Sequence, residues 1–220
     1  MSAWRWINTE LGAPAWNMAF DEALLESAPG IGAPLLRFYG WTEPAATFGY
    51  FQHYAEIAAW THLRPLIRRP TGGGLVPHEA DWTYSLVFPP RDPWYELRAV
   101  DSYRRLHEWI ARGFCAAGIP AELAATAHKE IPGQCFAGAE QFDLLVNGRK
   151  IAGAAQRRTR DGLLIQGSIQ PRGINLERAR FEAALIEPTW EQWKTTGPFL
   201  ARVDELAAVK YSQPVYNQQR

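Results

Sequence analysis

The run Arg68-Arg69-Pro70-Thr71-Gly72-Gly73-Gly74 sets the strongest limit on what this chain can fold into. Glycine loses more backbone freedom than any other residue when it is ordered, so three in a row weaken a helix or a strand interior. Such a run is useful where bare backbone N–H groups must approach a ligand, and the two arginines can hold a carboxylate or a phosphate. The sequence therefore predicts a ligand-binding loop, with a tight turn between strands as the alternative.

A second constraining segment, residues 147–156, reads Asn-Gly-Arg-Lys-Ile-Ala-Gly-Ala-Ala-Gln. Asn-Gly is the strongest two-residue hairpin signal, so it predicts paired strands over 141–146 and 149–158. Alternate residues of a strand share a face, which predicts that Lys150 stands with Ala152 and Ala154. The small neighbours would leave a slot for a slim chain beside the ammonium. A surface lysine on an edge strand is the alternative.

The remaining pattern predicts an α+β fold with a mixed, largely antiparallel sheet packed by helices, because strands alternate with helices and several are joined by hairpins. Neither a repeat nor a linker is visible, which predicts one domain over residues 1–220 with a polar tail from about 211 to 220. The further expected strands are 35–39, 45–50, 65–69, 82–88, 122–126 and 163–170, and the expected helices are 14–27, 53–63, 95–117, 176–184 and 203–209.

Composition excludes several classes of function. The chain has 220 residues, of which 47% are hydrophobic, and its 23 basic residues are balanced by 23 acidic ones. A balanced charge argues against nucleic acid as a partner, so the pairs Arg104-Arg105 and Arg157-Arg158 are interpreted as solvated faces or docking points for an acidic partner. No secretory signal and no membrane-spanning apolar run are visible. Two cysteines are too few for a disulfide framework, which favours a reduced, cytoplasmic location.

The spacing of the histidines does not indicate a metal site. His78-Glu79 does not begin a zinc-protease motif, because Trp82 occupies the position where the second histidine would stand. The other four histidines lack metal-ligand spacing, so we predict no metal. His78 is instead a candidate ligand-binding residue beside the glycine run.

Together these motifs resemble the lipoate–protein ligase and octanoyltransferase family of the biotin/lipoate ligase superfamily. Segments 17–24 and 36–52 agree, and the resemblance covers Trp4 to Pro171. It implies the catalytic-domain fold of that family, with Lys150 donating to the acyl carbonyl and stabilising negative charge on its oxygen during transfer. The substrate-binding residues it implies are Arg68, Arg69, Thr71, Gly72, Gly73, Gly74, His78, Gly153, Ala154 and Gln156.

The two cysteines have different expected roles. Cys115 falls in the long predicted helix beside Phe114 and is expected to be a small core residue. Cys135 falls in a glycine-rich loop shortly before Lys150, where by itself it would be an incidental loop cysteine. By resemblance, cysteine-dependent octanoyltransferases keep a Cys-Phe pair in this place, which makes Cys135 the predicted nucleophile. A cationic neighbour such as Lys150 would favour its reactive thiolate form.

The resemblance leaves two mechanisms. In a transferase, which needs no cofactor, a thiolate takes octanoyl from acyl carrier protein and passes it, or a lipoyl group, to a lysine of a lipoyl domain. Such domains belong to 2-oxoacid dehydrogenases or to the glycine cleavage H protein. In a ligase, free lipoate reacts with ATP and Mg²⁺ to give an acyl-adenylate.

Three features favour the transferase: Cys135, the segments 82–85 and 166–169, which are similar to transferase motifs, and the short chain after Pro171. The intact Gly74 is the ligase pattern and keeps ATP use open. A biotin ligase is disfavoured, because neither Gly-Arg-Gly-Arg nor Lys-Trp-Pro-Asn occurs. We therefore expect an octanoyltransferase, with the ligase and a catalytically silent acyl- or carrier-protein-binding module as alternatives.

Overall fold

An eight-stranded sheet runs through the centre of the molecule in the order β13-β1-β2-β6-β12-β11-β10-β7. The computed structural model describes residues 3–129 and 138–219. In this sheet β1 runs parallel to β2 and β13, and the other neighbours are antiparallel. The predicted α+β class with a mixed, largely antiparallel sheet is confirmed. The strands are β1 (Arg5–Gly12), β2 (Leu35–Trp41), β6 (Trp82–Phe88), β7 (Glu122–Leu123), β10 (Leu144–Val146), β11 (Arg149–Thr159), β12 (Gly162–Ile169) and β13 (Glu191–Gln192).

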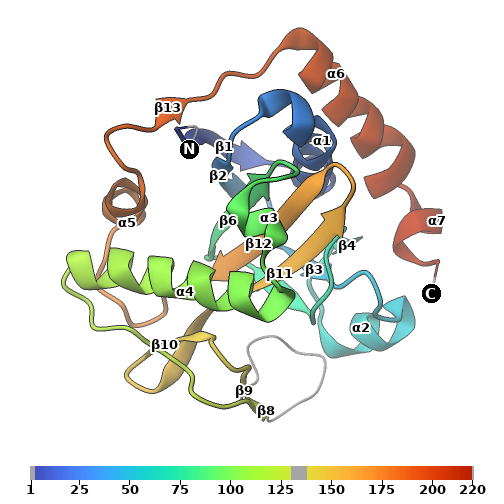
Figure 1. Ribbon diagram of the computed structural model, residues 1–220. Helices are drawn as coiled ribbons and strands as arrows, with labels where there is room; N and C mark the ends of the chain where they lie inside the picture. Colours follow the sequence, from blue (N-terminus) through green and yellow to red (C-terminus); the bar gives the residue numbers. More distant parts are fainter. Residues whose placement is uncertain (1–2, 130–137, 220) are drawn as a thin grey trace.

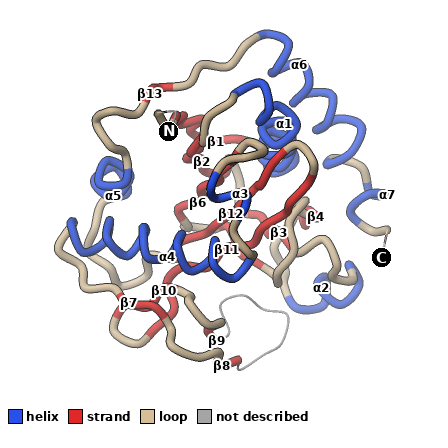
Figure 2. The backbone as a smooth tube through the Cα atoms, viewed as in Figure 1, coloured by secondary structure: helices blue, strands red, loops and turns tan. Residues whose placement is uncertain are grey.

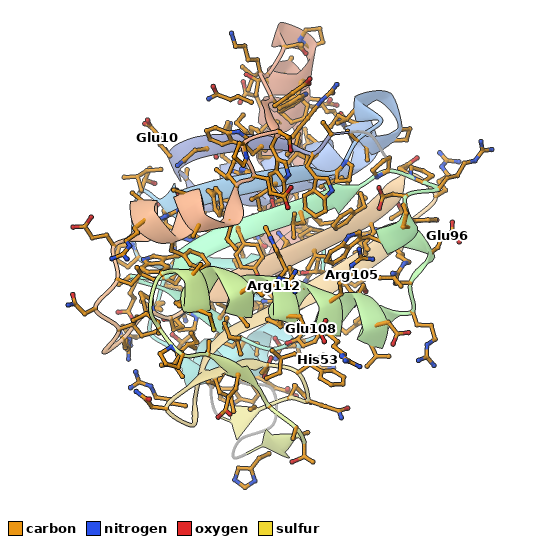
Figure 3. The ribbon with its side chains drawn as sticks, turned by 60° about the vertical axis from the view of Figure 1, so that its left-hand side comes forward. Glu10, His53, Glu96, Arg105, Glu108 and Arg112 are labelled. Carbon is orange, nitrogen blue, oxygen red and sulfur yellow. The ribbon has the colours of Figure 1, made fainter. Side chains whose placement is uncertain are left out.

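Helices cover both faces of this sheet (Figures 1 and 2). On one face α1 (Pro14–Ile31) packs on the strands, and α6 (Gly197–Leu206) packs on α1. On the other face lie α4 (Ala99–Ala116) and α5 (Arg178–Leu185). The course of α4 across the sheet is marked by Arg105, Glu108 and Arg112 in Figure 3. Because both faces are covered, β12 is buried along its whole length, including its polar residues Gln166 and Ser168.

The Asn147-Gly148 hairpin forms as predicted, with both residues at positive φ (51° and 71°). A second hairpin joins β11 to β12, and its register runs from Ala152 opposite Ile169 to Thr159 opposite Gly162. These two hairpins place β10, β11 and β12 side by side. They bring the small residues of β11 against the middle of the sheet.

Several predicted helix boundaries were wrong, among them the start of α6 at Gly197 where the sequence predicted 203, and two of the errors have a clear physical cause. The first helix does not end at Ser27: it continues through Pro29 to Ile31, and Gly32 ends it with φ 67° and an N–H bond to the Ala28 carbonyl. A proline in the last turn therefore does not end this helix, and the left-handed glycine does. The helix predicted over 95–117 is divided into α3 (Pro93–Glu96) and α4, because the extended backbone at Leu97 and Arg98 separates them.

Cys115 was expected in the core, and the structure shows it exposed as a free thiol. Phe114 and Ala111 are the α4 residues that point inward at this level. The next position along the helix faces outward, since one residue advances the helix by about 100°.

A smaller three-stranded sheet, with order β4-β3-β5, lies beside the large one. Its strands are β4 (Leu66–Arg68), β3 (Ala45–Phe48) and β5 (Val76–His78), and α2 (Tyr54–Trp60) packs on it through Ile57. The glycine run connects β4 to β5. A further two-stranded pair consists of β8 (His128–Lys129) and β9 (Gly138–Ala139).

The segment expected as a polar tail contains ordered structure. A π-helical turn, η1 (Ala207–Tyr211), leads to α7 (Pro214–Asn217), and the Tyr211 and Asn217 side chains are buried. Asn217 Oδ1 accepts the backbone N–H of Arg68 at 2.8 Å, and the Arg68 guanidinium donates to the carbonyls of Tyr216 and Asn217. The same guanidinium donates to the Tyr50 and Gln52 carbonyls at 2.7 Å. Arg68 therefore joins the start of the glycine run to the last helix.

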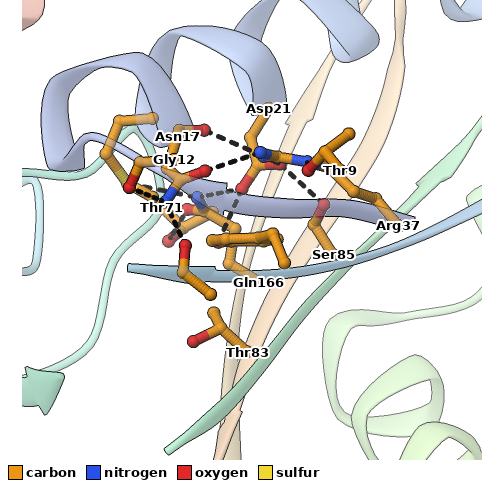
Figure 4. A network of polar contacts seen from close by, with 12 residues as sticks. Thr9, Gly12, Asn17, Asp21, Arg37, Thr71, Thr83, Ser85 and Gln166 are labelled. Atoms are coloured by element: carbon orange, nitrogen blue, oxygen red, sulfur yellow. Dashed lines mark hydrogen bonds and ion pairs between the residues drawn. The ribbon is translucent and has the colours of Figure 1, made fainter. Parts of the chain in front are cut away.

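A buried ion pair joins α1 to the centre of the sheet (Figure 4). Arg37 lies 2.7 Å from Asp21, and both side chains are fully inaccessible. Arg37 also donates to Asn17 Oδ1 at 2.7 Å. Asp21 accepts bonds from Ser85 and from Gln166. Both charged groups of this network, Arg37 and Asp21, are hydrogen-bonded, and these bonds offset the free-energy cost of burying them.

Replacing Arg37 with methionine is expected to destabilise the fold by about 3–5 kcal/mol, because Asp21 would remain buried without its counter-ion. The measurement is the urea midpoint with an unchanged m-value. Arg202→Met is the matched control, since the Arg202–Glu26 pair lies at 2.9 Å with side chains that are 41% and 38% exposed. Loss of such a surface pair costs about 0–1 kcal/mol. Equal losses in the two variants would contradict the prediction.

Candidate active site

A cavity of about 310 Å³ lies between the large and the small sheet. Its lining is mostly apolar or glycine backbone, and Met18, Val76, Ala154 and Ala155 contribute to its walls. Lys150 is the only lysine that lines this cavity among the described residues. Gly73 and Gly74 of the glycine run line the same cavity. The structure thus brings together the two motifs that the sequence singled out, as predicted.

Lys150 is held in a defined position. Its Nζ lies 2.7 Å from Asp143 Oδ2, with side-chain exposures of 8% and 0%. A Cβ built on Gly153 would lie 3.1 Å from both Cε and Nζ of this lysine. The end of the lysine therefore lies over the bare backbone of Gly153, and an alanine there would have to displace it.

The predicted neighbours of Lys150 were partly wrong. Ala152 is fully buried in the core with Leu144 and does not line the cavity, whereas Gly153, Ala154 and Ala155 do. The cause is a β-bulge: Leu145 pairs with Lys150 but Leu144 pairs with Ala152, so one extra residue of β11 is inserted. A bulge breaks the alternation of side chains, which places Gly153 rather than Ala152 beside Lys150.

Arg69 shapes the glycine loop. Its guanidinium donates to the Gly72 carbonyl at 2.5 and 3.0 Å and to the Gly74 carbonyl at 2.7 Å. Gly73 has φ 84°, and a Cβ on Gly49 would lie 1.9 Å from the Gly73 carbonyl oxygen. The two backbones are in direct contact, so glycine is required at position 49. Arg69 also lines the cavity, so it both organises the loop and faces the ligand space.

Thr71 connects this loop to the buried network. Its hydroxyl donates to Gln166 Oε1 at 2.7 Å, and Gln166 Nε2 donates to Asp21 Oδ2 at 2.7 Å. Thr71 itself is fully buried and does not line the cavity, whereas Gln166 does. Thr71, which the sequence predicted to bind substrate, thus contacts Gln166 of the cavity wall.

His78 lines the cavity between two hydrogen-bonding side chains. Its Nδ1 lies 2.8 Å from Asp81 Oδ2, its Nε2 lies 2.8 Å from Thr47 Oγ1, and its ring stacks on Trp41. Burial by itself raises the pKa of Asp81. The charge and hydrogen bond of His78, with bonds from Ser168 and Thr83, outweigh it and hold that pKa below its ordinary value of 3.8.

Three further residues predicted at the site do not line the cavity. Arg68 donates to the backbone carbonyls described above and does not line the cavity. Gln156 bonds to Ser102 and to the Ala99 carbonyl of α4. Gly72 contributes its carbonyl to Arg69 and is not in the lining. Cys135 lies outside the described residues.

Several lining residues escaped the sequence analysis, among them Tyr39, Trp41, Thr47 and Tyr103. The first three lie in the segment 36–52 that supported the resemblance but were given no role, and Tyr103 lies on α4, distant in the chain from both site motifs. Asp143 was missed as well, although a carboxylate directly before the buried strand β10 is an unusual placement that calls for a partner. Among the described residues, no group of three His, Cys, Asp or Glu side chains is placed to hold a metal ion. None of the described helices is long and apolar enough to cross a membrane.

His107 lies behind the site in an unusual state. It is fully buried, and neither ring nitrogen has a hydrogen-bond partner among the described residues. Burial, and then the charge of Lys150, lower its pKa from 6.5 to about 3. The imidazole is therefore neutral at neutral pH, and its role in the native state is one of packing against Tyr103.

The neutral, buried imidazole of His107 predicts that the unfolding free energy falls at acid pH. In the unfolded chain His107 gains a proton below pH 6.5, while in the folded protein it stays neutral to about pH 3. Its contribution to stability is thus complete above pH 6.5 and is lost as the pH falls toward 3, at about 1.4 kcal/mol per unit. We expect His107→Leu to flatten the decline of unfolding free energy between pH 6.5 and 4, as measured by urea titration. The exposed His53→Gln variant is the control and should retain the decline, and an identical decline in His107→Leu would contradict the assignment.

The fold and the cavity define a class of site in which one lysine and a glycine-rich loop line a mostly apolar cavity between two sheets. Residues 13–214 match the family described as the Lipoyl protein ligase A/B catalytic domain. The chain therefore belongs to the lipoyl protein ligase A/B family.

Several curated relatives carry the name Octanoyltransferase LipM. The protein from Carboxydothermus hydrogenoformans is 38% identical over 175 residues, which cover 77% of this chain and 65% of that one. The protein from Halalkalibacterium halodurans is 35% identical over 182 residues, covering 77% and 66%. The chain thus spans about two thirds of the length of these relatives. The structure of a T. acidophilum protein described as a lipoate protein ligase, with bound lipoic acid, superimposes on this chain with a TM-score of 0.82. The two sequences are 21% identical and the match covers all of both chains, which shows that the fold is shared.

Proposed function

We propose that this protein is an octanoyltransferase of protein lipoylation. It moves an octanoyl group, or a lipoyl group, from acyl carrier protein to a lysine of a lipoyl domain in a 2-oxoacid dehydrogenase or in the glycine cleavage H protein. The observation that carries the proposal is Lys150, an ammonium held over the bare backbone of Gly153 in an apolar cavity. The relatives named octanoyltransferase support the transferase over the ligase.

The chemistry proceeds in two transfers. The Cys135 thiolate attacks the carbonyl carbon of the donor thioester, and the carbonyl oxygen gains negative charge that the Lys150 ammonium stabilises. The carrier thiol leaves with the bond electrons and takes a proton, and the octanoyl group remains on Cys135 as a thioester. The amine of the lipoyl-domain lysine then attacks this thioester, loses a proton and releases the Cys135 thiol. Splitting the transfer in this way replaces one difficult step by two easier ones.

The cavity suits the acyl chain. Glycine and alanine line the part near Lys150, which leaves room for a narrow methylene chain, and Met18 and Val76 offer apolar contacts. Burial of each methylene contributes about 0.8 kcal/mol, so a chain of octanoyl length gains affinity mainly from the apolar wall. Orientation of the polar head then falls to Lys150 and to the glycine loop.

The test supplies two donors to the purified protein and an apo lipoyl domain. One reaction contains octanoyl-carrier protein without nucleotide, and the other contains lipoate with ATP and Mg²⁺. Intact mass of the lipoyl domain should show octanoylation in the first reaction, with no requirement for ATP. Modification only in the second reaction would promote the ligase, and binding of the donor without modification in either would promote the silent binding module.

A further inference from the structure

Asp143, at the start of β10, concentrates polar contacts at the edge of the cavity. Its Oδ2 lies 2.7 Å from Lys150 Nζ and accepts the Glu140 N–H at 2.6 Å, and its Oδ1 accepts the Tyr103 hydroxyl. Its backbone is fixed as well, because its carbonyl accepts the Ala124 N–H at 2.8 Å. A fully buried carboxylate that accepts from three donors is held in one position, so it can fix the end of a lysine that contacts it.

Tyr103 links this carboxylate to the strand that carries the lysine. It projects from α4, and its hydroxyl also accepts the Ala154 N–H at 3.4 Å. This contact is available because β10 pairs with β11 only as far as Ala152, so the edge of β11 beyond that residue is open. Burial, and then the charge of Asp143, raise the pKa of Tyr103 well above 10, so its hydroxyl keeps its proton and remains a donor.

From this geometry we propose that Asp143 and Tyr103 are positioning residues for Lys150. Asp143 fixes the ammonium over Gly153, and Tyr103 fixes Asp143 against β11. The proposal rests on the proposed function, in which Lys150 is the group that contacts the acyl carbonyl; Asp143 and Tyr103 act through it. It also specifies how Lys150 acts: the end of its side chain is fixed by a buried carboxylate, so that it meets the acyl carbonyl as a positioned hydrogen-bond donor.

A double-mutant cycle separates this role from a structural one. Asp143→Asn should lower the rate of octanoyl transfer about 10²-fold, the usual cost of a misplaced catalytic group. In a Lys150→Ala background the same substitution should change the rate by less than about threefold, because the two residues act as a unit. A loss of similar size in both backgrounds would overturn the proposal.

Tyr103→Phe provides a milder variant that leaves the ion pair in place. Removing one hydrogen bond to a charged group should slow transfer about tenfold. Tyr95→Phe is the matched control: Tyr95 also donates to a partner on β11, the Thr159 carbonyl at 3.0 Å, but it does not line the cavity. Its rate should equal that of the unmodified protein, and an equal loss in both tyrosine variants would contradict the role of Tyr103.

A second readout does not depend on activity. The chain contains four lysines, Lys129, Lys150, Lys194 and Lys210. Brief treatment with acetic anhydride, read by peptide mass, should modify Lys150 more slowly than the exposed Lys194. Asp143→Asn, or Tyr103→Phe if the first variant does not fold, should raise the relative rate at Lys150 several-fold, and an unchanged ratio would overturn the positioning role. If the unmodified protein transfers no octanoyl group from either donor, the proposed function fails while this ratio still decides the inference.

Discussion

Lys150→Ala is expected to lower the rate of octanoyl transfer by about 10²–10³, the range found when one donor to a developing oxyanion is removed. The fold should survive, because Tyr103 and the Glu140 N–H still donate to Asp143 and the lysine lies at the cavity wall, where water can replace it. Transfer by intact mass and thermal unfolding of the same sample are the two measurements.

Lys150→Arg should restore little of this activity. The tip of the lysine lies 3.1 Å from the position of a Cβ on Gly153, and a planar guanidinium is wider than an ammonium. A Lys150→Ala variant that is fully active would remove Lys150 from the mechanism, and one that is unfolded would show the residue to be structural.

Cys135→Ala is expected to abolish transfer from octanoyl-carrier protein altogether, because no other group in the proposed mechanism accepts the acyl chain. The protein mixed with donor alone should accumulate an octanoyl adduct on Cys135 that hydroxylamine removes. Peptide mapping is required, because the second cysteine of the chain, Cys115, is an exposed thiol.

Cys115→Ala is the matched control and should keep both the adduct and the transfer activity. Its side chain lies on the outward side of α4 and is absent from the cavity lining. Full activity in Cys135→Ala would instead favour direct or adenylate transfer.

Local signals in the sequence predicted the fold well. The β6 strand begins and ends as expected, since the alternation of apolar and polar residues from Trp82 is typical of a strand. The Asn147-Gly148 hairpin needs only the positive φ that these two residues adopt readily. Helix ends were less accurate, because they depend on single capping residues such as Gly32 and on the extended pair that separates α3 from α4.

The site was predictable where one motif carries it and unpredictable where distant residues meet. Arg68 and Arg69 are equivalent in the sequence, yet one donates to backbone carbonyls of α7 and the other lines the cavity, and only the tertiary fold distinguishes them. The bulge in β11 depends on how β10 pairs with it, so simple alternation misplaced Ala152. Asp143 and Tyr103 meet across forty positions of the chain, and nothing local to either residue indicates the contact.

The contact between Arg68 and Asn217 has a consequence for how the protein is made. The two residues are separated by 149 positions, and synthesis runs from the N-terminus, so Arg68 and its glycine loop emerge long before their partner does. While the chain is still on the ribosome, the sheet can form but the Arg68 guanidinium lacks the Tyr216 and Asn217 carbonyls that it bonds in the finished protein. The hydrogen bonds of Arg68 at the start of the glycine loop are therefore completed only after residue 217 has left the exit tunnel, when α7 can reach them.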